Sequence, residues 1–268
     1  MRSEMSANVA AFEQTIRSTL ALAETFDEAD WARPTDCPGW SVQDVVAHLA
    51  SVEIGMLGED AAPGHVLAGD PAHVRNALGR IVEIGVDARR GRTGPEVLAE
   101  LREVLERRLA VLPGIDPEEP ALAPTGNTVP YAELMVFRTF DCWVHEQDVR
   151  RAVGRPGNLG APGAERARRI MTRGLPMVVG KRAGAEPGQT VAFEVGGDLP
   201  FTLYIEVDGA GKAAFVDHVA APDTLLRMDW ETYMRLGTGR CVPGDVVVET
   251  AGDTALAGRI LANMALTP

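Results

Sequence analysis

The sequence predicts an α+β chain of two domains, an antiparallel four-helix bundle followed by an α+β domain with a mostly antiparallel sheet. Apolar residues recur at helical spacing through the first half, and the period becomes two from Thr190 onward. A stretch rich in Gly and Pro, Arg155–Gly160, separates the two patterns. With 268 residues the chain is long enough for two cores. We expect domains at 1–154 and 155–268, with a linker and a helix over 155–185.

The first half reads as helices with clear start signals. Glu4–Thr25 carries apolar residues at spacings of three and four, which is one face of an amphipathic helix. Ser41, with Asp44 three residues later, predicts a capped helix over Ser41–Gly58, and Trp40 is expected to pack onto Val45 as a hydrophobic staple. Further segments complete the half: a helix over Asp70–Arg90, a helix from the Thr93–Glu96 capping box to Leu112, a loop over Pro113–Pro124 and a helix over Pro130–Val153.

The second half alternates between strands and helices. A helical stretch over Ala164–Val179 precedes a meander of strands that turns at Asp208-Gly209. The expected strands are VAFEV, FTLYIEV, Lys212–Val216, Thr224–Met228 and Asp245–Thr250, and the expected helices are Trp230–Leu236 and Thr254–Met264.

Three ionisable residues lie on the apolar stripes of two of these helices. His48 follows Val45 and precedes Val52 at helical spacing, while Asp141 and His145 are four residues apart on the Pro130–Val153 helix. Positions i and i+4 are separated by only about 40° around a helix. A buried ionisable group is costly unless a partner satisfies it. Two imidazoles and one carboxylate facing a bundle interior therefore predict an open divalent-metal site.

Neighbouring residues offer other interpretations. Asp141 can instead pair with Arg138 at i−3 as a surface ion pair. Asp148 shares a face with His145 and can either replace Asp141 as a ligand or orient His145, and we prefer the orienting role. Cys142 points about 100° away from Asp141, which favours a packing role. Two imidazoles and a carboxylate suit zinc and also non-haem Fe²⁺, so the residues alone leave the metal open.

Composition excludes several classes of partner. A net charge of −12 argues against nucleic acid or an anionic membrane as the main partner. The sequence has no apolar run of roughly 18 residues, and its first residues lack the pattern of a signal peptide. Three scattered cysteines, Cys37, Cys142 and Cys241, predict a reducing, cytoplasmic location. The sequence does not indicate the oligomeric state.

Two stretches resemble the signatures of the mycothiol-dependent maleylpyruvate isomerase family: CPGWSVQDVVAHLASVE and RTFDCWVHEQDVRRAVG. LLRMDWETYMRLGTGR, followed by Gly252-Asp253 and a closing helix, looks like the family's second domain. The resemblance implies a DinB-like bundle followed by a sterol-carrier-like domain. It also implies that His48, Asp141 and His145 hold zinc. The family has glutamate where this chain has Asp141, which is one methylene shorter.

The resemblance further implies chemistry with mycothiol, the low-molecular-weight thiol of actinobacteria. A thiol bound to zinc is deprotonated, and its thiolate can add to an electrophilic small molecule. If the thiolate leaves again the reaction is a cis–trans isomerisation, and if it stays the reaction is an S-transfer. A carboxylate substrate needs a cationic anchor, for which we expect Arg240 first and Arg227 next. The alternatives are a metal-dependent hydrolase on the same bundle and a non-catalytic protein that binds a small molecule.

Overall fold

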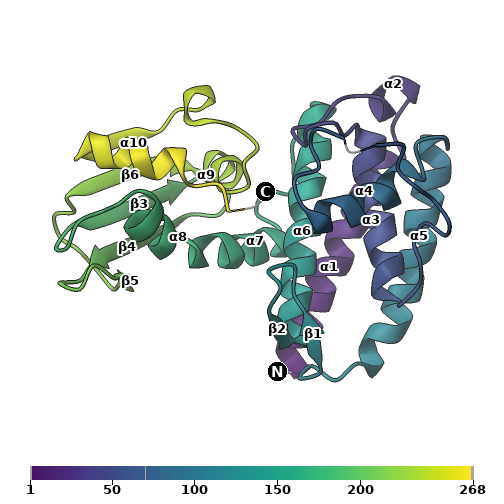
Figure 1. The fold of residues 1–268 in the computed structure, drawn as a ribbon, viewed down its shortest axis with the longest axis horizontal. Helices are drawn as coiled ribbons and strands as arrows, with labels where there is room; N and C mark the ends of the chain where they lie inside the picture. Colours follow the sequence, from purple (N-terminus) through teal and green to yellow (C-terminus); the bar gives the residue numbers. More distant parts are fainter. Residues whose placement is uncertain (1, 70, 267–268) are drawn as a thin grey trace. The chain divides into compact units, whose positions relative to one another are not determined.

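The computed structural model describes residues 2–69 and 71–266, which form two compact units, Met1–Ala167 and Arg168–Pro268 (Figure 1). The division falls within helix α7, Pro162–Arg173. The segment after the bundle groups with the first unit because it is bonded to the last bundle helix. The Trp143 indole donates to the Asn158 carbonyl at 3.1 Å, and the Asn158 amide donates to Glu146 at 2.7 Å.

Four long helices form the first unit as a bundle, in agreement with the prediction. Helix α1 contacts α5 and α6, and α3 also contacts α5 and α6, so the four close into a ring around one core. Two shorter helices flank them. The bounds are α1 Arg2–Ala23, α2 Glu28–Trp31, α3 Val42–Met56, α4 Ala77–Asp87, α5 Gly94–Val111 and α6 Tyr131–Ala152.

The predicted caps fix where two of these helices begin. The Asp44 amide donates to Ser41 Oγ at 3.2 Å while the Ser41 amide donates to the Asp44 carboxylate at 2.9 Å. Thr93 and Glu96 form the same reciprocal cap on α5. A cap fixes the rotational phase of the residues that follow, so Ser41 determines that His48 faces the interior, where it is only 5% exposed.

Two expected segments of the first half differ in the structure. The segment expected as a loop from Pro113 to Pro124 contains a short 3₁₀ turn, Leu112–Gly114, and a strand, β1 Pro120–Leu122, that pairs with β2 Thr128–Pro130. Strands of three residues are too short to leave an alternating pattern. The helix expected over Asp70–Arg90 begins only at Ala77, because Asn76 caps it by accepting from the Gly79 amide; Asp70 itself lies outside the described residues.

The second unit contains a five-stranded sheet in the order β5-β4-β3-β6-β7. All neighbouring pairs are antiparallel except β3 and β6, which are parallel, so the sheet is mostly antiparallel as predicted. The expected Ala164–Val179 helix is divided at Gly174. The remaining bounds are α8 Leu175–Met177, η2 Val178–Arg182, β3 Thr190–Gly196, β4 Phe201–Val207, β5 Ala213–Val216, β6 Thr224–Asp229, α9 Trp230–Gly237, η3 Pro243–Asp245, β7 Glu249–Gly252 and α10 Thr254–Ala262.

Among the described residues, no helix has the length and apolar character that crossing a membrane requires.

Candidate metal centre

The three residues predicted as ligands lie together between α3 and α6. His48 Nε2 is 3.2 Å from Asp141 Oδ2, and His145 Nε2 is 3.6 Å from Asp141 Oδ1. The two imidazole rings have centroids 4.6 Å apart. One ligand atom from each residue lies within 4.8 Å of the others, and both histidines are buried. The structure thus brings together residues 93 positions apart in the sequence.

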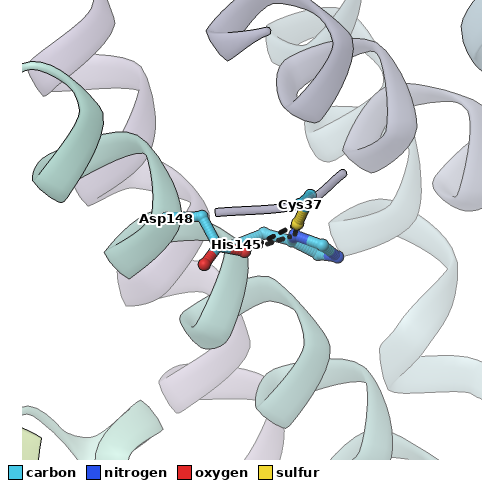
Figure 2. A group of neighbouring side chains, drawn as sticks. All are labelled: Cys37, His145 and Asp148. Carbon is cyan, nitrogen blue, oxygen red and sulfur yellow. Dashed lines mark hydrogen bonds and ion pairs between the residues drawn. The ribbon is translucent and has the colours of Figure 1, made fainter. Parts of the chain in front are cut away.

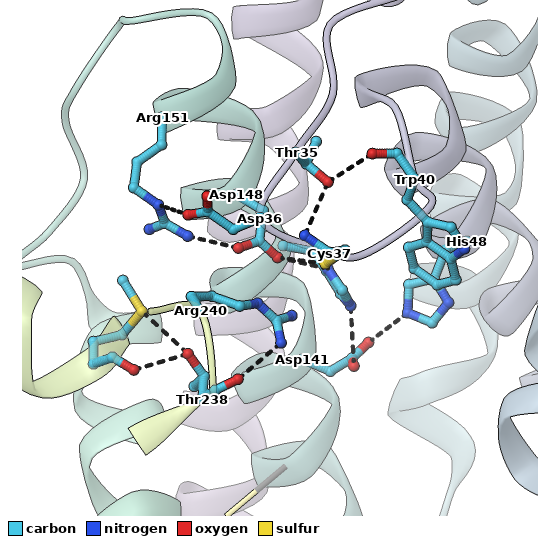
Figure 3. Close-up of polar contacts among 12 residues, drawn as sticks. Thr35, Asp36, Cys37, Trp40, His48, Asp141, Asp148, Arg151, Thr238 and Arg240 are labelled. Atoms are coloured by element: carbon cyan, nitrogen blue, oxygen red, sulfur yellow. Dashed lines mark hydrogen bonds and ion pairs between the residues drawn. The ribbon is translucent and has the colours of Figure 1, made fainter. Parts of the chain in front are cut away.

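His145 is oriented from behind by a buried carboxylate. Its Nδ1 lies 3.1 Å from Asp148 Oδ2, and the Cys37 thiol donates to the same oxygen at 3.1 Å (Figure 2). The other Asp148 oxygen accepts from Arg151 at 2.6 Å, and Arg151 also donates to Asp36 (Figure 3). This is the contact that the orienting role of Asp148 requires, because a ligating imidazole keeps its N–H at Nδ1 and offers the Nε2 lone pair to the metal.

Cys37 lies beside His145 and Asp148, although the sequence alone does not distinguish it from the other two cysteines. It lies in the tight turn before α3, where Gly39 has a positive φ of 78°. Thr35 holds this turn by accepting from the Cys37 amide at 3.2 Å and donating to the Trp40 carbonyl at 2.9 Å (Figure 3). In the sequence, the one feature that points to a role for Cys37 is its position directly before Pro38-Gly39-Trp40, the turn that precedes α3.

Trp40 packs over both imidazoles. Its ring centroid is 5.1 Å from that of His48 and 5.9 Å from that of His145. The indole N–H donates to Glu83 at 2.9 Å, and this buried carboxylate also contacts His73 at 2.9 Å and Arg90 at 2.8 Å. Trp40 was expected as a staple on Val45; the structure adds this contact with the two histidines. The indole therefore has a fixed position above them.

Arg138 contacts Asp141, and this alternative from the sequence is present in the structure. Arg138 Nη1 donates to Asp141 Oδ2 at 2.8 Å. The pair is not a surface pair, because the Arg138 side chain is 7% exposed and also donates to Glu53 at 2.7 Å. Glu53 accepts in turn from Arg108 at 2.8 Å, and both of these side chains are fully buried. Asp141 therefore contacts the guanidinium and the two imidazoles at once.

The surroundings of the two histidines shift their pKa values in opposite directions. Burial lowers the pKa of His48. Burial also acts to lower the pKa of His145, but the charge of Asp141 and the hydrogen bond to Asp148 outweigh it and raise that pKa to about 10. Burial acts to raise the pKa of Asp141, yet the charges of His48, Arg138 and His145 hold it well below the ordinary range. The carboxylate is ionised at neutral pH.

These residues fit a divalent cation. Two imidazole nitrogens and one carboxylate oxygen are the protein ligands of many catalytic zinc and iron sites, which keep a further position open. The buried Asp148–His145 contact is the support that a ligating histidine ordinarily has. His48 Nδ1 is buried with no hydrogen-bond partner in the described part of the chain, so Trp40 packing, rather than a hydrogen bond at Nδ1, steadies that ring.

The two arginines predicted as substrate anchors lie in the second unit. Arg227, on β6, is exposed and donates to Glu194 and Glu249 on the neighbouring strands, both at 2.8 Å. Arg240 follows α9, and its Nη1 donates to the Thr238 carbonyl at 2.9 Å. Their catalytic role stays a prediction. Arg227 is held in a cross-strand ion ladder with Glu194 and Glu249.

The fold and the site define a helical-bundle protein with a buried pair of histidines and a carboxylate, joined to an α+β unit. The family described as "Mycothiol maleylpyruvate isomerase N-terminal domain" matches residues 12–150. Two crystal structures, of the mycothiol-dependent maleylpyruvate isomerase and of a point mutant of it, are similar in fold. Each is 14% identical and covers 92% of both chains, with TM-scores of 0.54 and 0.56. No curated protein matches the chain.

The family match spans more than half of the chain and includes all three predicted ligands. This chain therefore belongs to the mycothiol maleylpyruvate isomerase N-terminal domain family. The resemblance drawn from the two sequence stretches is confirmed, and the structural similarity shows that the fold of the isomerase extends through both units.

Proposed function

We propose that this protein is a zinc-dependent enzyme that uses mycothiol as its thiol cofactor or cosubstrate on an electrophilic small molecule. The observation that carries the proposal is the His48–Asp141–His145 group, whose ligand atoms lie within 4.8 Å of one another, in the domain that the family shares. The proposed ligand atoms are Nε2 of both histidines and an oxygen of Asp141. When bound there, zinc lowers the pKa of a thiol, so that thiolate is available at neutral pH.

The charges around Asp141 favour an anionic ligand. Glu53 and Asp141 carry two negative charges, and Arg108 and Arg138 carry two positive ones, so this cluster is formally neutral. Arg138 thus offsets the charge of the one carboxylate in the proposed ligand set. The protein then neutralises little of the charge of a divalent cation bound there, and the cation attracts a negatively charged thiolate more strongly than a neutral donor.

The histidines and their neighbours supply orientation. Asp148 holds the Nδ1 proton of His145, and Trp40 covers both rings, so the Nε2 atoms stay directed at one point. The isomerase and S-transferase reactions share one step, the formation of a bond between the thiol sulfur and an electrophilic carbon. Isomerisation then requires rotation about the adjacent carbon–carbon bond and release of the same thiol, whereas S-transfer keeps the new bond.

The test uses full-length protein with its zinc content measured. Mycothiol is supplied with a panel of electrophiles that includes maleylpyruvate. Mass spectrometry follows S-conjugates, and NMR follows cis–trans conversion. We expect one of these products with wild type and a loss of at least about 100-fold with His48→Ala, since a ligand is removed. His65→Ala is the matched control, because His65 contacts Asp87 away from the cluster.

Each negative result has a meaning. Zinc-loaded protein that neither consumes mycothiol nor changes any electrophile contradicts the proposal. Turnover without added thiol would instead identify a hydrolase. Equal zinc in wild type and His48→Ala would show that the ligands are misassigned.

A further inference from the structure

A second group of metal-binding atoms lies on the other side of the His145 ring. Cys37 Sγ, His145 Nδ1 and Asp148 Oδ2 meet there, all from buried residues (Figure 2). The sulfur is 3.8 Å from Nδ1 and 3.1 Å from Oδ2, and Nδ1 is 3.1 Å from Oδ2. Three kinds of donor atom, from segments 108 residues apart in the chain, converge on one point.

The separations suit a small tetrahedral ion. Metal–ligand bonds of about 2.0–2.3 Å at tetrahedral angles place neighbouring ligand atoms about 3.3–3.8 Å apart. The three observed separations are at or slightly below this range, so binding requires shifts of only a few tenths of an ångström. A thiolate with an imidazole is typical of zinc and softer cations, and it excludes Mg²⁺ and Ca²⁺, which take oxygen ligands.

We propose that Cys37, His145 Nδ1 and Asp148 form a second, inhibitory site for a soft divalent cation such as Cd²⁺ or excess Zn²⁺. Binding releases two protons to solvent, one from the Cys37 thiol and one from His145 Nδ1, and a sulfur–metal and a nitrogen–metal bond form in their place. The surroundings accept the added charge, because Asp148 and Asp36 carry two negative charges against the single positive charge of Arg151.

The inhibitory effect follows from the imidazole that the two groups share. A neutral imidazole has one bare nitrogen and one N–H. A cation on Nδ1 leaves the proton on Nε2, which faces Asp141. His145 then no longer offers a lone pair to the His48–Asp141 side. Filling the second site therefore weakens metal binding at the first.

The experiment is a Cd²⁺ titration of the metal-free full-length protein, followed by the ultraviolet charge-transfer band of a thiolate–cadmium bond. The His48–Asp141–His145 group contains no sulfur, so cadmium bound there does not contribute to the band. We expect the band in wild type and in His48→Ala, and its loss in Cys37→Ser. Cys142→Ser is the matched control, because Cys142 is another buried thiol and packs in the bundle core. Cys241 is present in every variant, so any absorbance from cadmium bound to it is the same in all of them.

Circular dichroism confirms the fold of each variant, and Asp148→Asn gives a second test that keeps the thiol. We expect this variant to bind Cd²⁺ at least about 10-fold more weakly, since a charged ligand is lost. The proposal is overturned if wild type shows no band, if the band persists in Cys37→Ser, or if Asp148→Asn binds as wild type does. Then the group is a hydrogen-bonded support for His145 only. None of these readouts depends on catalysis, so they separate this site from the proposed function.

Discussion

Replacing Glu53 by Gln removes the single anion shared by two buried guanidinium groups. Glu53 accepts from Arg108 at 2.8 Å and from Arg138 at 2.7 Å, and all three side chains are between 0 and 7% exposed. Breaking a buried ion pair typically costs about 3–5 kcal/mol, because the remaining charge stays desolvated. Arg138 keeps Asp141 as a partner, but among the described residues Arg108 keeps only the Tyr131 hydroxyl, at 3.0 Å. We expect a loss of about 3–5 kcal/mol, a large part of the roughly 5–15 kcal/mol that stabilises a typical protein.

Urea unfolding followed by tryptophan fluorescence measures this loss. Three of the four tryptophans, Trp31, Trp40 and Trp143, lie in the first unit, so the signal reports mainly the bundle. Glu13→Gln is the matched control, since Glu13 also pairs with an arginine, Arg17, at 2.8 Å but on the surface. We expect about 0.2–1 kcal/mol there. If Glu53→Gln loses no more stability than Glu13→Gln, the buried network does not stabilise the bundle as argued.

Three further variants test the site and its support. His48→Ala should reduce bound zinc at least about 10-fold, measured by elemental analysis after dialysis, while His65→Ala should bind as much zinc as wild type. Equal zinc in the two variants would refute the assignment of His48 as a ligand. Trp40→Leu should weaken zinc binding by about 10–100-fold in a chelator competition, and Trp40→Phe should recover part of it, because a ring still covers the imidazoles. Burial acts to raise the pKa of Glu83, but hydrogen bonds from His73, Trp40 and Arg90 outweigh it, and the pKa is lowered. The ionised Glu83 therefore stabilises the fold at any pH above its pKa in the unfolded chain, about 4.3, and this stabilisation is lost as the pH falls through its lower pKa in the folded protein. Wild type should therefore be more stable than Glu83→Gln near neutral pH, with the difference in urea midpoints shrinking in acid; a difference that grows in acid would contradict this.

The elements that the sequence predicts well are those set by local signals. The Ser41–Asp44 cap fixes the start of α3 and so the direction of His48, and the four-residue spacing of Asp141 and His145 places both on one side of α6. Contacts between distant segments left no such signal. Cys37 reaches Asp148 across 111 positions and Glu53 reaches Arg138 across 85, and only tertiary packing brings them together. The parallel pairing of β3 with β6 is likewise a property of the chain path, which the alternation of residues does not specify.

The buried ion network connects the helices that carry the site. Glu53 lies on α3, five residues after His48, and Arg138 lies on α6, seven residues before His145, while Arg108 comes from α5. The bonds of Glu53 to Arg138 and Arg108 therefore fix three helices relative to one another about one and a half to two turns from the imidazoles. Apolar side chains of similar volume would often be at least as stable in such a position. The charged groups of such a network pair only when the helices are in the correct register, and in this structure Arg138 Nη1 donates to Asp141 Oδ2 and leaves Oδ1 toward His145. We conclude that the network specifies the position of a short carboxylate, Asp141, between two histidines from different helices.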